Sequence, residues 1–226
     1  MPVPFRKKRF GDATTQSSAV SMRDIQEMRS PLSILSDLLV AGDTPRRSDL
    51  VVVLSGLPER KPYGLRLFRE SLAPRLILSV GRFEVRQIAS LGLEDGMGLR
   101  QMAQRIRPDQ RHFFVDFRGD SQRAVVAPLA GQGTFAELRS LARYLDGEPL
   151  NSLTIVSTSI HLRRVRFCCR RIPVFRNKLV NYLPVPEDSS SFQHELWWKR
   201  RSDRSYVASE YLKLCAYAVR YYALGR

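Results

Sequence analysis

The segment 153–171, which reads LTIVSTSIHLRRVRFCCRR, holds the side chains with the clearest chemical potential. The hydroxyl residues Thr158 and Ser159 come first. His161 and Arg164 follow, and their three-residue spacing puts both on one face of a helical turn. An imidazole can act as general acid, general base or hydrogen-bond donor near neutral pH. A guanidinium can hold a phosphate or carboxylate through its planar fork. The segment therefore predicts a site for an anionic ligand.

The same segment predicts a strand that runs into a helix. Residues 153–156 form a short β-prone run, and beyond the hydroxyl residues the apolar positions recur at helical spacing. Ligands of parallel sheets bind beyond the carboxyl ends of the strands. A helix start also offers unpaired N–H groups and the positive end of the helix dipole. We therefore expect the anion on the first turn of this helix.

Small residues end two further predicted strands. The apolar run 49–54 is typical of a central parallel strand and stops at Ser55-Gly56, and the strand at 76–79 stops at Ser79-Val80-Gly81. Glycine at such places lets a backbone approach a ligand closely, or serves a tight turn. Parallel strands present their carboxyl ends along one edge, so we expect Gly56, Ser79 and Gly81 to share a site with His161.

Thr134 and Glu137 have two interpretations. Their spacing fits a capping box, in which each side chain satisfies a backbone donor of the other, and this would account for both without a ligand. Alternatively, both belong to the site. The helix that they open is predicted to run through 144–145 and to be capped by Gly147.

The remaining pattern predicts an α/β fold. Further helices are expected from Pro31 to Gly42 and at 63–73, 83–90, 97–107, 192–201 and 205–223, and further strands at 112–115, 124–126 and 178–183. Strands that alternate with helices indicate βαβ units and a mostly parallel sheet covered on both faces. We expect a flexible basic tail over 1–23 and a single domain with C-terminal helices over 24–226.

The chain of 226 residues has a formal net charge of +15, which suggests nucleic acid, anionic lipid or anionic substrates as partners. Of its 37 basic residues 31 are Arg, a bias that can also reflect genomic base composition. No segment reaches the ~18 apolar residues of a membrane span, and the start lacks the apolar core of a signal peptide. We expect a cytoplasmic protein, with weak contact to anionic membrane through the basic cluster at 6–9.

Several familiar chemistries are not indicated. No G-x-x-x-x-G-K-[ST] loop or G-x-S-x-G elbow occurs, and Gly131-Gln132-Gly133 lacks the rest of the dinucleotide fingerprint. Three scattered histidines and three cysteines have no zinc-site spacing, so no metal site is predicted. The sequence leaves any cofactor and the oligomeric state unassigned.

Four segments together resemble one known family. They read DLVVVLSG at 49–56, GLRLFRESLAPRLILSVG at 64–81, GTFAEL at 133–138 and VSTSIHLRRVRF at 156–167. In this order they are similar to the YdcF-like family, a domain of unknown function that includes SanA and ElyC. The resemblance implies a Rossmann-like three-layer sandwich with one pocket. By position, that pocket is formed by Gly56, Ser79, Gly81, Thr134, Glu137, Thr158, Ser159, His161 and Arg164.

The resemblance has three departures and one functional implication. Leu57 and Val80 stand where members often keep small residues, and Glu137 is not followed by the usual Asn. Many relatives are tied to cell-envelope or polysaccharide metabolism. We therefore expect binding of a small anionic, phosphate-bearing or nucleotide-like ligand at the carboxyl edge of the sheet. A hydrolase or transferase would use His161 as acid or base and Arg164 to hold the anion.

Two other functions remain open from the sequence. The first is a binding module for a small ligand, with no turnover. The second is a basic nucleic-acid-binding protein, which is disfavoured because the aromatic residues stand mostly in core-like positions and are not interleaved with surface charge.

Overall fold

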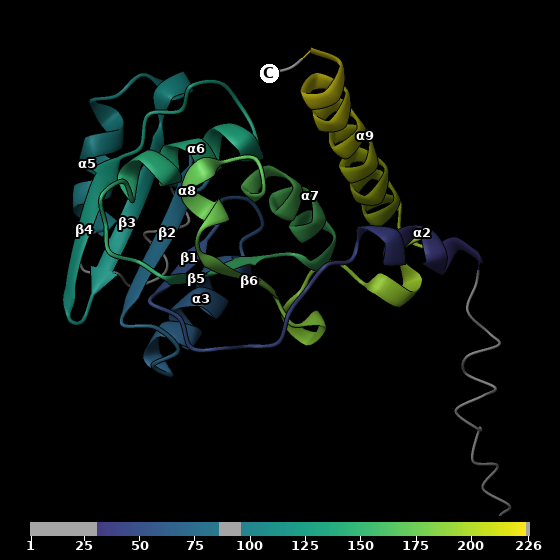
Figure 1. Ribbon diagram of the computed structural model, residues 1–226, viewed down its shortest axis with the longest axis horizontal. Coiled ribbons are helices and arrows are strands. Elements are labelled where there is room, and N and C mark those ends of the chain that lie inside the picture. The colour runs from purple at the N-terminus through teal and green to yellow at the C-terminus, as the bar shows by residue number, and fades with distance from the viewer. Residues whose placement is uncertain (1–30, 86–95, 225–226) are drawn as a thin grey trace, which may run out of the picture.

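A six-stranded sheet forms the centre of the molecule. The computed structural model describes residues 31–85 and 96–224. The strands are β1 (Leu50–Val53), β2 (Arg75–Gly81), β3 (His112–Arg118), β4 (Ser121–Val126), β5 (Ser152–Ser157) and β6 (Leu179–Pro184). The helices are α2 (Pro31–Leu39), α3 (Arg60–Arg69), α5 (Gly96–Gln104), α6 (Thr134–Tyr144), α7 (Ser159–Cys169), α8 (Pro173–Arg176) and α9 (Arg201–Leu224). Figure 1 shows α9 on the far side of α7 from the sheet, and α9 contacts α7 and α2.

The strand order is β4-β3-β2-β1-β5-β6. Strands β2, β1, β5 and β6 pair in parallel, which confirms the α/β class and the mostly parallel sheet. β3 is antiparallel to both of its neighbours, β2 and β4, and it continues into β4 through the two-residue turn Gly119-Asp120, where Gly119 has a φ of 57°. An apolar run has the same pattern in either direction, so the sequence did not reveal this reversal.

Alternate residues of β1 face two separate apolar cores. Leu50 and Val52 pack with residues of α6 and α7, whereas Val51 and Val53 pack with residues of α3 on the opposite face. All four side chains are fully buried. The unbroken apolar run thus forms a central strand covered by helices on both sides, as its pattern predicts.

The C-terminal part differs from the sequence prediction. The helix expected at 205–223 is α9, which begins earlier, at Arg201. The prediction of a helix at 192–201 is wrong, because only a 3₁₀ turn forms there, at His194–Leu196. Phe192 and Trp197 both insert into a small core with Leu39 of α2 and Val207 of α9. Anchoring both aromatic rings in one cluster overrides the local helical pattern.

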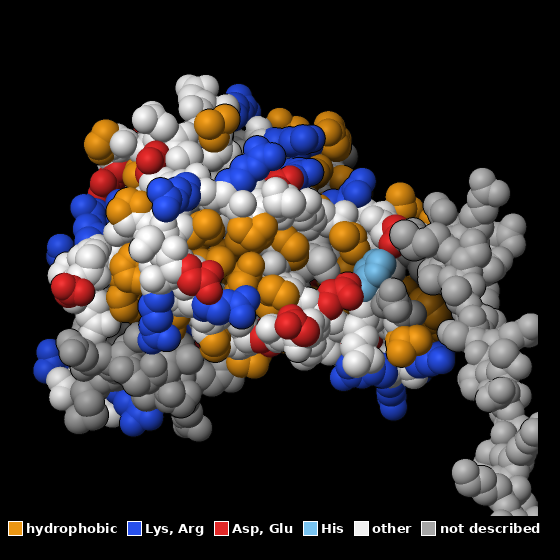
Figure 2. Space-filling view, turned by 90° about the horizontal axis from the view of Figure 1, so that it is seen from below, with side chains coloured by type: hydrophobic (Ala, Val, Ile, Leu, Met, Phe, Trp, Pro, Cys, Tyr) orange, Lys and Arg blue, Asp and Glu red, His pale blue; other side chains and the backbone are white. Residues whose placement is uncertain are grey.

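Some predictions fall outside the described residues. These are the tail at 1–23 and most of the helix at 83–90. Among the described helices, none combines the length and the apolar character needed to cross a bilayer. On the face shown in Figure 2, basic side chains stand in separate groups with acidic and apolar side chains between them. On that face, the positive charge is not gathered into one patch.

Gly64 is expected to be intolerant of even one methyl group. It lies in α3 against β1, where an added Cβ would fall inside van der Waals contact with Cγ2 of Val53. We expect Gly64→Ala to lower the free energy of unfolding by about 1–3 kcal/mol through overpacking, although Ala favours a helix. Urea unfolding checks this, with Arg69→Ala on the exposed side of α3 as the matched control. A Gly64→Ala protein as stable as the parent would contradict the prediction.

Candidate functional site

A cavity of about 540 Å³ lies at the carboxyl end of β1, between the starts of α6 and α7 and one side of α9. We call it the anion cavity, after the ligand that the sequence predicts. Of the predicted site residues, those that line it are Gly56, Thr134, Glu137, His161 and Arg164. They come from three segments that are far apart in the sequence. The shared sheet edge therefore brings together much of the constellation that the motifs indicated.

His161 is held between two hydroxyl groups. Its Nδ1 lies 2.6 Å from Oγ of Ser157, and its Nε2 lies 3.0 Å from Oγ1 of Thr134. Burial, followed by the charges of Arg60, Arg164 and Lys213, places the pKa of His161 well below its ordinary value of 6.5. The imidazole is therefore neutral at physiological pH. One ring nitrogen can then accept a hydrogen bond or a proton.

Arg164 has a partner within the chain. Its Nε and Nη2 each lie 2.9 Å from a carboxylate oxygen of Glu210 in α9, and its Nη1 donates to Thr134. Lys213 reaches the same carboxylate at 3.3 Å. The planar fork expected to hold a ligand thus binds Glu210, and this bidentate pair attaches α9 to α7.

The capping box at Thr134 and Glu137 is not formed. Gly133, with a φ of 83°, is the residue before the helix, and no side chain caps it. Glu137 instead accepts hydrogen bonds from the backbone N–H of Ser55, at 2.8 Å, and from the hydroxyl of Ser79. The carboxylate faces the strand ends from the buried side of α6, so tertiary donors replace the local one. Thr134 contacts His161 and Arg164.

The other predicted residues support the cavity from below or lie beside it. Ser79 is inside β2, not at its end, because the pairing with β3 continues through Gly81. Its buried hydroxyl lies 2.9 Å from Nε2 of His112. The N–H of Gly81 donates to Glu84, which also pairs with the buried Lys61. His112 lines the cavity, whereas Ser79, Gly81, Glu84 and Lys61 do not.

Thr158 and Ser159 precede and begin α7 without lining the cavity. The hydroxyl of Thr158 is buried and accepts a hydrogen bond from Nη2 of Arg60 at 3.0 Å. It also lies 2.6 Å from the hydroxyl of Tyr206. The carbonyl of Ser159 accepts from the N–H of Ala41. Thr158 therefore orients a cation of the site, whereas Ser159 joins α7 to the segment after α2.

Arg60 is a functional candidate that the sequence prediction missed. Its Nη1 donates to the carbonyl of Ser55 at 2.5 Å, yet its Nε has no hydrogen-bond partner and the residue is only 3% exposed. Among the described residues no carboxylate lies within 4.0 Å of it. Gly56 has a φ of 132°, and a Cβ there would lie 2.6 Å from Nη1 of Arg60. Gly56 thus makes room for the guanidinium.

The prediction missed Arg60 because it began the helix at 63, which left this residue in a loop, whereas α3 begins at Arg60 itself. A second missed group is the face of α9 that closes the cavity, formed by Tyr206, Glu210, Lys213 and Tyr217. Their spacing of four, three and four residues is one helix face. That spacing was visible in the sequence and could have identified the group.

Comparison of the chain with protein-family models, with curated proteins and with solved structures gave no match. Within residues 31–85 and 96–224, no cluster of three or more His, Cys, Asp and Glu side chains is placed to hold a metal ion. A neutral imidazole, several hydroxyl groups and a buried guanidinium without a carboxylate partner surround a cavity of small-molecule size.

Proposed function

We propose that the anion cavity binds a small phosphate-bearing ligand, and that the chain is a YdcF-like domain with a Rossmann-like arrangement. The α/β sheet with helices on both faces supports this assignment, as do the motif residues gathered at one sheet edge. The ligand would lie at the start of α6, where the positive end of the helix dipole favours an anion, next to the side chains of α3 and α9.

The observation that carries the proposal is the charge of Arg60. The cations lining the cavity are Arg60, Arg164 and Lys213, against the carboxylates of Glu137 and Glu210, which leaves one positive charge. An unpaired buried cation is costly, by several kcal/mol. Arg60 is the cation without a carboxylate, and it lines the cavity. An anion that enters the cavity would supply the missing partner.

Calorimetry of the binding of inorganic phosphate and of pyrophosphate tests the proposal. Arg60→Met is expected to weaken binding by about 1.5–3 kcal/mol, the range for a hydrogen bond to a charged group. That is a factor of about 10 to 150 in Kd. Arg69→Met, which removes an equal charge from the exposed side of α3, is expected to have no such effect.

Two further variants keep this test decisive. Arg60→Lys retains the charge and should retain part of the affinity. Lys213→Met changes a side chain that is 49% exposed, and it should weaken phosphate binding without unfolding the protein. Equal phosphate affinity in the parent, Arg60→Met and Lys213→Met would overturn the proposal, as would a parent protein that binds neither anion.

Whether binding leads to turnover rests on His161. In the enzyme form of the proposal, its neutral imidazole acts as general base in hydrolysis or transfer at a phosphorylated cell-envelope precursor in the cytoplasm. The alternative is a binding module. The enzyme is supported if the parent protein releases phosphate from pyrophosphate and if His161→Gln still binds pyrophosphate but no longer releases phosphate from it. Binding without release by the parent would support the module.

A further inference from the structure

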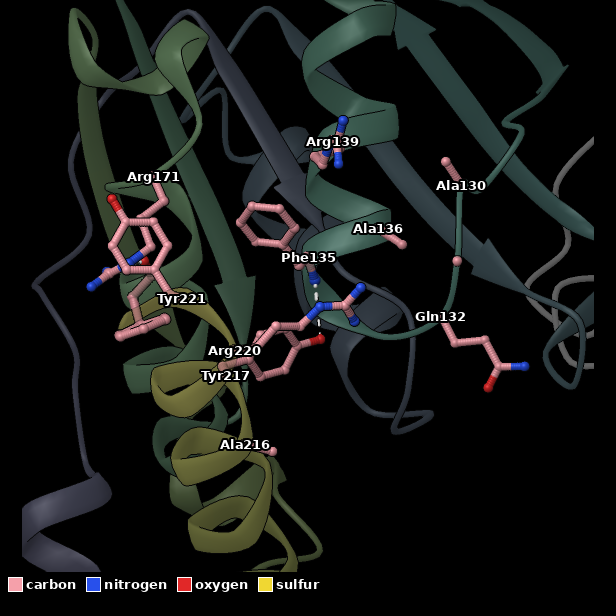
Figure 3. Close-up of a pocket in the computed structure, with 12 residues that line it drawn as sticks. Ala130, Gln132, Phe135, Ala136, Arg139, Arg171, Ala216, Tyr217, Arg220 and Tyr221 are labelled. Carbon is pink, nitrogen blue, oxygen red and sulfur yellow. Dashed lines mark hydrogen bonds between the residues drawn. The ribbon is translucent and has the colours of Figure 1, made fainter. Parts of the chain in front are cut away.

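A second cavity, of about 370 Å³, adjoins the anion cavity between α6, α7 and the C-terminal half of α9 (Figure 3). We call it the aromatic cavity. Its aromatic rings belong to Phe135, Phe167, Tyr217 and Tyr221. Its guanidinium groups belong to Arg139, Arg171 and Arg220. Gln132 and Tyr217 line both cavities, so one ligand can extend from one into the other.

The guanidinium of Arg171 is fixed among the rings. Its central carbon lies 3.4 Å from the ring centre of Phe167 and 4.2 Å from that of Tyr221. Its Nη1 donates to the carbonyl of Phe167, and its Nη2 donates to the hydroxyl of Tyr222, each at 2.8 Å. Its Nε is buried and has no hydrogen-bond partner. The cation is therefore oriented in advance and keeps one donor unused.

The charge of the aromatic cavity is entirely positive. No acidic residue lines it, and within the described residues none of its three arginines has a carboxylate within 4.0 Å. Arg139 lies over the ring of Phe135 at 5.9 Å, so cationic and aromatic surfaces alternate around the opening. Aromatic rings interleaved with guanidinium groups are suited to stacking on a planar base that belongs to an anionic molecule.

The junction between the cavities is shaped around Tyr217. The backbone N–H of Phe135 donates to the Tyr217 hydroxyl at 3.4 Å, the contact dashed in Figure 3. A Cβ on Gly133 would lie 2.7 Å from the same oxygen, and the φ of 83° at this residue also favours glycine. The loop before α6 thus places the tyrosine ring between the two volumes. Its ring lies 5.8 Å from the guanidinium carbon of Arg164 in the anion cavity.

We propose that the ligand is a nucleoside phosphate, with its base in the aromatic cavity and its phosphate groups in the anion cavity beyond Tyr217. This inference rests on the proposed function, because it assigns the second half of the same ligand. Stacking on an aromatic ring contributes about 1–3 kcal/mol per base and tolerates every base. A nucleoside diphosphate should therefore bind about 5- to 150-fold more tightly than pyrophosphate alone.

The test compares pyrophosphate, adenosine, ADP, GDP and UDP by calorimetry on the full chain. At least one diphosphate is expected to show the 5- to 150-fold advantage over pyrophosphate. Phe135→Leu and Tyr221→Leu keep apolar side chains but remove the flat surface, and each should reduce this advantage while leaving pyrophosphate affinity unchanged. Phe83→Leu is the matched control. That ring is 79% exposed, has its own arginine neighbour, Arg82, and lines neither cavity.

The outcomes separate this inference from the proposed function. Diphosphates that bind no better than pyrophosphate, or an advantage that survives in both cavity variants, would overturn the base site and leave anion binding standing. Adenosine that binds through Phe135 and Tyr221 while pyrophosphate does not bind would have the opposite meaning. It would support the base site and overturn the anion cavity. A parent protein that binds none of the five compounds overturns both.

Discussion

Replacing Arg164 with alanine is expected to lower the free energy of unfolding by about 3–5 kcal/mol, the range for breaking a buried ion pair from one side. The loss would leave the Glu210 carboxylate, which is only 2% exposed, without its two hydrogen bonds at 2.9 Å. Lys213 remains 3.3 Å away but is half-exposed, so it replaces only part of the interaction. Urea unfolding of both proteins measures the difference.

Arg166 provides the matched control for Arg164. It is in the same helix and also pairs with a carboxylate, that of Asp43 at 3.1 Å, but both partners are about one-third exposed. An exposed pair of this kind contributes about 0–1 kcal/mol, so Arg166→Ala should have a small effect. The double variant Arg164→Met with Glu210→Met removes both charges and should recover much of the stability lost in Arg164→Ala. Similar losses of unfolding free energy in Arg164→Ala and Arg166→Ala would show that the pair of Arg164 with Glu210 does not have the stabilising role assigned to it.

This pair shows where sequence reasoning reaches its limit. The position of Arg164 one turn into a helix at a strand end could be predicted from local spacing, and so could its place near His161. Its partner could not, because Glu210 is 46 residues further along the chain and its carboxylate faces Arg164 only after α9 packs on α7. Only the tertiary structure therefore shows which arginine of the site has no carboxylate partner. The prediction named Arg164, whereas Arg60 lacks a carboxylate.

The same distinction applies to the fold. Buried runs such as 50–53 and 153–156 could be predicted as central strands, since an apolar run without alternation is covered on both faces. The direction of β3 depends on a hairpin turn and on pairing with β2, which leave no mark on the apolar pattern. Glu137 fits a capping box by spacing alone, and only the neighbouring strand ends explain why it binds Ser55 and Ser79 instead.

The second prediction with a large expected effect is that the protein loses stability as the pH falls below about 6.5, in part because of His161. Burial is the first cause that lowers the pKa of His161, and it also lowers the pKa of His112, where Glu137 and Glu84 oppose it. Below pH ~6.5 these histidines therefore bind protons in the unfolded chain but not in the folded chain. Stability from these groups is complete above that pH and decreases below it.

The size of this effect follows from linkage. A histidine that is protonated only when unfolded adds up to ~1.4 kcal/mol of destabilisation per pH unit. His161 should contribute more of the slope than His112, because its pKa is well below the ordinary value whereas two carboxylates oppose the lowering at His112. Urea unfolding between pH ~7.5 and ~5 measures the slope. His161→Gln should remove the larger part of the contribution of the two histidines to this slope, because glutamine can still contact Ser157 and Thr134 but does not titrate.

The slope also distinguishes a neutral His161 from a charged one held by a bound anion. With pyrophosphate in the anion cavity, a negative charge beside the ring offsets the charges of Arg60 and Arg164, which help to lower its pKa. The decrease of stability with falling pH should therefore become less steep in the parent when pyrophosphate is bound. In His161→Gln, pyrophosphate should change this slope less. His194→Gln, which alters a histidine beside α2 and outside the cavity, is the reference replacement.

Parallel pH curves for the parent and His161→Gln would show that His161 takes up a proton as readily in the folded chain as in the unfolded one. In that case the imidazole could not be the neutral acid–base group that the enzyme form of the proposal requires.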